Sequence, residues 1–128
     1  MERKHHDTIK MKIKGYGEVS IDVEAAPMVE LFNKIGLETK YSCQGTPGTL
    51  DNFYIMFADR IKDKNIEKFL NELSDGKDYT PLVGKMVKWG RLVNGSIKYN
   101  WMYLNEHDFT YKDDYETIKE QFDSKWRN

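Results

Sequence analysis

The sequence predicts a single α+β domain with three helices and a mainly antiparallel sheet of about six strands, arranged along the chain as ββα-ββα-ββα. Three observations lead to this fold class. Residues 8–14 alternate between apolar and charged side chains, as a half-buried strand does. Three later segments repeat their apolar residues with the period of an amphipathic helix. Asn94 and Gly95 separate two long strand-like runs and suit a type I′ hairpin turn, because both central residues of that turn need positive φ.

The first ββα unit begins with residues 8–14, whose two faces carry Ile9, Met11 and Ile13 on one side and Lys10, Lys12 and Lys14 on the other. A turn at residues 15–17 leads into a returning strand at 18–22, with Val19 and Ile21 facing inward. A helix then starts at Asp22 or Glu24 and tolerates Pro27 in its first turn. Gly36 ends this helix. Its apolar stripe consists of Met28, Leu31, Phe32 and Ile35.

The second unit contains strands at residues 38–43 and 53–57, joined by a loop at 44–52 that is rich in Gly, Pro and Thr. We expect Asp63 to cap the next helix and Gly76 to end it. The apolar stripe of this helix consists of Ile66, Phe69, Leu70 and Leu73.

The third unit is the hairpin of residues 85–93 and 96–104, followed by a C-terminal helix. Residues 110–113 resemble a capping box that opens this helix. Its apolar side chains are Tyr115, Ile118, Phe122 and Trp126. One sheet covered by helices on one face is the simplest way to bury the three stripes, and two smaller sheets are the alternative.

Composition limits the classes of protein that fit. A chain of 128 residues with 39% hydrophobic residues can bury a core of its own, so we expect one domain with residues 1–7 as a mobile charged tail. The absence of a leader, the short apolar runs and the single Cys43 predict a cytoplasmic protein without a membrane span or disulfide. The net charge of −1 argues against duplex DNA as a partner but permits a small anion.

The first candidate site is the strand-to-loop segment at residues 41–46. It brings hydroxyl groups, an amide and backbone N–H groups together beside glycines that let a ligand approach closely, so it could hold a phosphate or a ribose. The alternative is a connecting loop in which Cys43 is buried as a small hydrophobic residue. A nucleophilic role for Cys43 would require a neighbouring histidine. The candidate ligand-binding residues here are Tyr41, Ser42, Gln44, Gly45 and Thr46.

The second candidate site follows from the hairpin register. A two-residue turn at 94–95 places Leu92, Ile97, Tyr99 and Trp101 on one face, which we expect to be core. The other face offers a ring for stacking on a base, cations for phosphate and an amide for a base edge. Packing under a helix with solvated cations is the alternative. Since like charges directly opposite one another are unfavourable without an anion, we prefer a site. Its residues are Trp89, Arg91, Lys98 and Asn100.

Other chemistry finds less support. We expect no cofactor, and no metal centre, because His5, His6 and Asp7 have no distant partners and there is no Cys pair. A two-histidine phosphodiesterase would need a second His-x-Ser/Thr motif, and residues 107–109 do not supply it. The aromatic residues of the C-terminal third could instead form a dimer interface, and a ligand site shared between two protomers would use both properties.

Residues 15–59 resemble a known family. A GYG-x-V-x-I-D strand leads into an A-x-M-V-x-L-F-N-K-x-G helix, followed by T-K-Y-S-C-Q-G and an aromatic strand that ends in F-A-D. This run resembles phage anti-Thoeris proteins that sequester cyclic ADP-ribose signals. The resemblance implies a non-catalytic protein of the bacterial host cytoplasm, homodimeric or of higher order, that binds a cyclic ADP-ribose isomer or a cyclic oligonucleotide and so counters bacterial defence. A Cys-dependent or RNA-modification-associated enzyme and a protein-binding inhibitor of a host factor are the alternatives.

Overall fold

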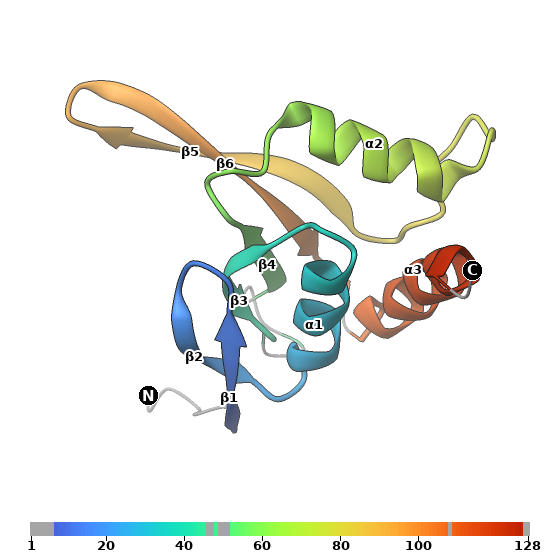
Figure 1. Cartoon of the computed structure of the whole chain (residues 1–128), viewed down its shortest axis with the longest axis horizontal. Helices are drawn as coiled ribbons and strands as arrows, with labels where there is room; N and C mark the ends of the chain where they lie inside the picture. Colours follow the sequence, from blue (N-terminus) through green and yellow to red (C-terminus); the bar gives the residue numbers. More distant parts are fainter. Residues whose placement is uncertain (1–6, 46–47, 49–51, 108, 127–128) are drawn as a thin grey trace.

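The computed structural model describes residues 7–45, 48, 52–107 and 109–126, with side chains to residue 123 in the last helix. It confirms the predicted α+β class and the ββα-ββα-ββα order (Figure 1). The elements are β1 Thr8–Ile13, β2 Gly17–Asp22, α1 Ala26–Lys34, β3 Thr39–Cys43, β4 Phe53–Phe57, α2 Asp63–Ser74, β5 Lys85–Val93, β6 Ser96–Asn105 and α3 Tyr111–Trp126.

The strands form two sheets, so the simplest expectation of one continuous sheet is wrong and its alternative is correct. β1 and β2 make a two-stranded antiparallel sheet, and the other four strands pair antiparallel in the order β3-β4-β6-β5. β2 lies beside β3. At the end of β3, however, the Asp22 carboxylate accepts the backbone N–H of Gln44 at 2.9 Å, so a side chain makes this link between the sheets.

The long hairpin has the predicted register. Asn94 and Gly95 have φ of 49° and 81°, the left-handed region that a type I′ turn requires. Consequently Arg91 lies opposite Lys98, and Trp89 lies opposite Asn100. Strands β4 and β6 continue the ladder with Met56 opposite Met102.

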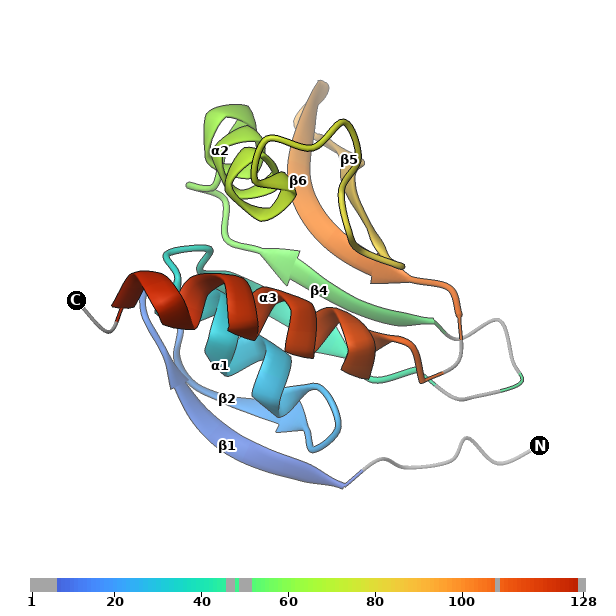
Figure 2. The same cartoon turned by 90° about the vertical axis from the view of Figure 1, so that its right-hand side faces the viewer.

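The three helices cover one face of the four-stranded sheet, where the main core lies (Figure 2). Phe32 of α1 is at the centre of this core. Its ring packs edge-on against Phe57 of β4 and Phe69 of α2, with ring centroids 5.1 and 6.0 Å apart. Phe69 in turn stacks on Phe122 of α3. The predicted helical stripes therefore meet in one core, as their spacing requires.

The opposite side of the same sheet carries no helix among the described residues, and we call it the open face. Tyr41 and Trp89 are both more than half exposed on it, whereas Met56 and Met102 at its centre are buried. The register assigns the following side chains to the open face: Tyr41, Cys43, Tyr54, Met56, Lys85, Val87, Trp89, Arg91, Lys98, Asn100, Met102 and Leu104.

One predicted helix start and one predicted helix cap are corrected. Helix α1 begins at Ala26 because the backbone N–H of Ala25 bonds the carbonyl of Asp22 at 3.0 Å, so the preceding residues form a turn. Helix α2 begins with Asp63 itself, and Lys62 precedes it in an extended conformation. The Asp63 carboxylate caps nothing, because it accepts hydrogen bonds from the Trp101 indole at 2.8 Å and from Lys88 at 3.1 Å.

Two further expectations change near the C-terminus. The single O–H of Thr110 is shared between Asn105 Oδ1 and the carbonyl of His107, so it anchors the β6–α3 connection rather than forming the predicted capping box. The hairpin face expected to be core is mostly solvated. Leu92 is 74% exposed and Ile97 61%, because the distal half of the hairpin projects beyond the body of the domain (Figure 1). Only Trp101, nearer the body, packs against the core.

Two expectations remain, one on the N-terminal tail and one on membrane-spanning helices. The carbonyl of Asp7 accepts the N–H of Val23 at 2.9 Å, so the predicted tail is tied to the domain at its last residue, while residues 1–6 lie outside the described part. In the described residues, no helix has the length and apolar character needed to cross a membrane.

Candidate functional site

The hairpin residues predicted to form a site lie together on the open face. Trp89 and Asn100 are directly opposed, and Arg91 and Lys98 form the adjacent pair. The Trp89 ring is 57% exposed, which leaves it accessible for stacking. Within the described part of the chain Lys98 makes no ion pair. We call Trp89, Arg91 and Lys98 the hairpin corner.

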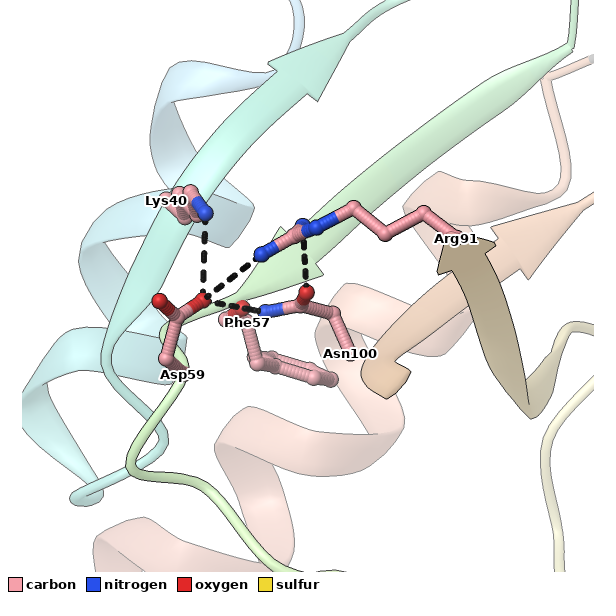
Figure 3. A network of polar contacts seen from close by, with 5 residues as sticks. All are labelled: Lys40, Phe57, Asp59, Arg91 and Asn100. Carbon is pink, nitrogen blue, oxygen red and sulfur yellow. Dashed lines mark hydrogen bonds and ion pairs between the residues drawn. The ribbon is translucent and has the colours of Figure 1, made fainter. Parts of the chain in front are cut away.

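A carboxylate from outside the hairpin holds this corner in place (Figure 3). Asp59 follows the end of β4, and its Oδ1 accepts hydrogen bonds from Lys40 Nζ at 3.1 Å and from Asn100 Nδ2 at 2.7 Å. The Arg91 guanidinium lies 3.9 Å from the same oxygen and donates to Asn100 Oδ1 at 2.7 Å. The four side chains therefore connect β3, the end of β4 and both strands of the hairpin.

Asn100 has a positioning role in this network. It is buried, and its amide nitrogen donates both to Asp59 and to the backbone carbonyl of Phe57, the latter at 3.1 Å. Its amide oxygen accepts the Arg91 hydrogen bond. Since the amide is engaged within the chain, Asn100 is better suited to fixing Arg91 than to reading a base edge, which was its predicted role.

The charge balance at the corner favours an anion. The hydrogen bond from Asn100, followed by that from Lys40, holds the pKa of Asp59 below its ordinary value, so this carboxyl is ionised at neutral pH. Lys40 and Arg91 therefore share this one negative charge, and Lys98 lies opposite Arg91 on the neighbouring strand. The Asp59 carboxylate lies near the positive charge of Arg91, which bonds Asn100. Since Lys98 lies directly opposite Arg91, part of the repulsion between these two cations remains. A phosphate would compensate the remaining charge.

The loop residues predicted to bind a ligand lie in different environments. Tyr41 lies on the open face and is 59% exposed, whereas the register turns Ser42 toward the helix-covered face beside Ile55. Gln44 links distant segments, because its side-chain oxygen accepts the N–H of Glu24 at 3.1 Å. Thr46 lies outside the described residues.

The backbone N–H groups of the same loop are also engaged. Gln44 donates to Asp22, and the N–H of Gly45 lies 3.5 Å from the sulfur of Cys43. These groups are thus not displayed for a phosphate in the way that an anion-binding turn requires. Of the loop residues, Tyr41 has the geometry that fits a ligand contact.

Cys43 and His107 are the described residues on which nucleophilic chemistry would depend. Cys43 is a partly buried thiol on the open face and is not part of a disulfide. His107 lies in the β6–α3 connection, and its N–H donates to Asn105. His5 and His6 are outside the described residues. In the described part of the chain no three His, Cys, Asp or Glu side chains come together in a way that would hold a metal ion.

Sequence reasoning missed Lys40 and Asp59. Both belong to segments whose local pattern was recognised, a strand and the F-A-D strand end. Their role depends on Asn100, 41 residues beyond Asp59 in the chain. No local sequence pattern predicts a hydrogen bond between residues so far apart in the chain. The nearest signal was an acidic residue placed directly after a buried strand.

Three grooves formed by described residues lie away from the hairpin corner. Those of about 370 Å³ and 330 Å³ flank α1 and α3, and one of about 240 Å³ lies between α1, α2 and α3. The largest has Ile9 and Met11 on one wall and Leu31 and Tyr115 on the other, with charged residues of both signs at its rim. None contains a hairpin-corner residue. The open face is consequently a platform rather than one of these grooves.

In comparisons with known proteins, no family model, curated protein or solved structure matches this chain. The functional argument therefore rests on the geometry of the site.

Proposed function

We propose that this protein binds a nucleotide at the hairpin corner without transforming it. The observation that carries the proposal is the Arg91 guanidinium fixed by Asn100, with the exposed Trp89 two residues before it on β5 and Lys98 opposite it on β6. A base can stack on the indole while its phosphate lies between the two cations. The corresponding biological role is sequestration of a cyclic nucleotide signal in the cytoplasm of a bacterial host by a phage protein, and the family resemblance makes cyclic ADP-ribose isomers the first ligands to test.

The polar network supports binding rather than acid–base chemistry. General acid–base catalysis favours a group whose pKa lies near the working pH. Asp59 has a lowered pKa, and its Oδ1 is engaged by Lys40 and Asn100, so it acts as an ionised anchor for cations. A pre-arranged guanidinium also reduces the entropy lost on binding, because its rotamer is already fixed.

The direct experiment is ligand retention. Purified protein is mixed with cyclic ADP-ribose isomers, separated from free ligand and then heated, and the released small molecules are identified by mass spectrometry. We expect the ligand to elute with the native protein and to be recovered intact after denaturation. Recovery of a cleaved product would replace the binding proposal with an enzymatic one, and absence of any retained nucleotide would exclude this ligand class.

Matched variants locate the site. Trp89→Ala removes the stacking ring and should weaken binding by about 1–3 kcal/mol, the usual worth of one base–aromatic stack. Arg91→Gln removes the charge and should weaken binding and reduce its salt dependence. Tyr79→Ala and Lys10→Gln are the controls, because both side chains are exposed and lie outside the hairpin, in the α2–β5 connection and in β1. Equal affinities of all four variants would exclude the hairpin corner as the site.

A second function is supported by the opposite face of the projecting hairpin, where Leu92, Ile97 and Tyr99 are exposed. Contiguous exposed apolar side chains on a soluble domain typify protein contacts, and tyrosine is enriched in them. Homodimerisation through this tip is the simplest form of the proposal. Sedimentation measurements should then give a dimer that Ile97→Ser converts to a monomer, while Val83→Ser leaves it intact. A monomeric wild-type protein would remove this interpretation.

A further inference from the structure

The open face extends well beyond the hairpin corner, and its far edge carries a second exposed ring. Tyr41 on β3 and Val87 on β5 lie in the same row across the sheet, through Met56 and Met102. Trp89 is two residues further along β5, on the same face. Neighbouring strands are about 4.8 Å apart and two residues add about 7 Å along β5, so the backbone positions of Tyr41 and Trp89 are about 16 Å apart.

This separation decides the size of ligand that can use both rings. Bases stacked on one another in a duplex are about 3.4 Å apart, so neither one base nor two stacked neighbours can reach both Tyr41 and Trp89. Several linked nucleotides can. The buried Met56 and Met102 form an apolar floor between the rings, and the partly exposed Tyr54, Val87 and Leu104 surround it.

The charges of the face complement a phosphate backbone. Lys85, Arg91 and Lys98 lie on β5 and β6, and Lys40 reaches the face from β3. The carboxylates that meet these cations are Asp59, at the Lys40–Arg91 network, and Glu106, 3.3 Å from Lys85. Among the described residues of this face the cations therefore exceed the acids, although the whole chain carries a net charge of −1.

We infer that the open face binds linear single-stranded nucleic acid, with Trp89 and Tyr41 as stacking positions for two bases that are not neighbours. The inference rests on the proposed function, because Trp89 and the adjacent cations form its first subsite. An antiparallel sheet with helices on one face and exposed aromatic rings on the other is a platform of the kind on which single strands stack with little sequence preference.

The test compares a short and a long ligand on the same variants. Fluorescein-labelled hexathymidylate is titrated with the full chain by fluorescence anisotropy, and thymidine monophosphate is measured by calorimetry. Wild-type protein should bind the hexamer at least about tenfold more tightly than the monophosphate, since a second stack and further phosphates contribute. The logarithm of the hexamer binding constant should fall with the logarithm of salt concentration at a slope of about −2, as expected for three phosphate contacts on a single strand.

The variants separate the two subsites. Tyr41→Ala should weaken hexamer binding by about 5- to 100-fold and leave the monophosphate unchanged, Trp89→Ala should weaken both, and Tyr41→Phe should retain hexamer binding. Tyr79→Ala is the matched control, with a similarly exposed ring in the α2–β5 connection. Circular dichroism confirms that each variant is folded.

The outcomes separate this inference from the proposed function. Equal binding of the hexamer by wild type and Tyr41→Ala overturns the inference while the hairpin corner stands. No binding of either ligand by wild type overturns the inference and removes thymidine nucleotides from the proposed function, which the cyclic ADP-ribose experiment then decides separately.

Discussion

At the scale of single residues, the stability of this fold depends on how closely side chains approach the backbone where α3 meets the sheet. Gly84 lies directly before β5, and a Cβ built there would be 2.6 Å from the ring of Tyr103. That ring is fully buried, and its hydroxyl donates to Asp114 at 2.5 Å. Burial, the larger cause, and this hydrogen bond, the smaller one, raise the pKa of Tyr103 well above its ordinary value. The hydroxyl therefore remains a donor. The ring therefore cannot move aside.

Gly84→Ala should consequently lower the free energy of unfolding by about 1–3 kcal/mol, the usual cost of overpacking a core. Gly90→Ala is the matched control. A Cβ at Gly90 would approach the ring of Tyr99 at 3.1 Å and the Ile97 side chain at 3.6 Å, and both side chains are exposed and can shift. Urea unfolding of the two variants measures the difference. If both unfold at the same urea concentration, the Tyr103 ring moves to accommodate the added methyl group, and the prediction is wrong.

Asp59 makes a pH-dependent contribution. Its folded-state pKa lies below the ordinary value of 3.8, because Asn100 and then Lys40 stabilise the carboxylate. A depressed pKa adds stability above pH 3.8, and this contribution is lost as the pH falls below that value through the folded-state pKa. Wild type should therefore be more stable than Asp59→Asn at about pH 7, and the difference should shrink at about pH 2.5. Urea midpoints at both pH values measure it, and a constant difference would show that the charge of Asp59 contributes nothing.

At the scale of elements, α3 is attached to the sheet by one buried carboxylate. Asp114 accepts the N–H groups of Val83 at 2.8 Å and Gly84 at 2.7 Å, in addition to the Tyr103 hydroxyl. Both carboxylate oxygens are therefore used. The bonds fix the first turn of α3 to the segment that starts β5, and so they orient the hairpin relative to the core.

Asp114→Asn should lower the free energy of unfolding by about 2–3 kcal/mol, because its NH₂ group would face a backbone N–H and leave a buried donor without an acceptor. Asp113→Asn is the control, since the neighbouring carboxylate is exposed and should lose only about 0.3–1 kcal/mol from the helix dipole. Chemical denaturation of both proteins checks the prediction. Similar losses would mean that the Asp114 bonds are replaced by other contacts.

Local patterns determined how much of these elements could be predicted. The strand alternation, the helical stripes and the Asn94-Gly95 turn act over a few residues, so element order and hairpin register were read correctly. Which segments pair is decided by contacts distant in the chain. Hence the division into two sheets, the solvation of Leu92 and the role of Asp59 did not follow from the sequence. Asp63 was placed at the right helix start, but its partner Trp101 lies 38 residues away.

At the scale of the whole molecule, the domain combines a packed body with a hairpin that extends from it (Figure 1). The body contains the aromatic core around Phe32, whereas the distal hairpin exposes its large side chains on both faces. Regions with few buried apolar contacts open locally at a low free-energy cost. Ligand-binding segments are commonly drawn from such regions.

Amide hydrogen exchange should therefore be faster in the distal hairpin than in the rest of the four-stranded sheet. The amides of residues 90–99 should exchange through local opening, while those of β4 should require global unfolding. Mass spectrometry of exchanged peptides measures both at several protein concentrations. Protection at the tip that increases with concentration would support self-association through Leu92 and Ile97. Protection equal to that of β4 at every concentration would contradict the division.

The connection between β4 and α2 holds the hairpin from both sides. Asp59 bonds Asn100 on the open face, and Asp63 bonds the adjacent Trp101 on the helix-covered face. The spacing of these two carboxylates along the chain thus fixes the direction in which the hairpin leaves the body. For protein engineering, residues 92–97 form a solvated hairpin tip whose sequence can be exchanged. An insertion between the two aspartates would change this direction, provided that it keeps Ile61 in the core.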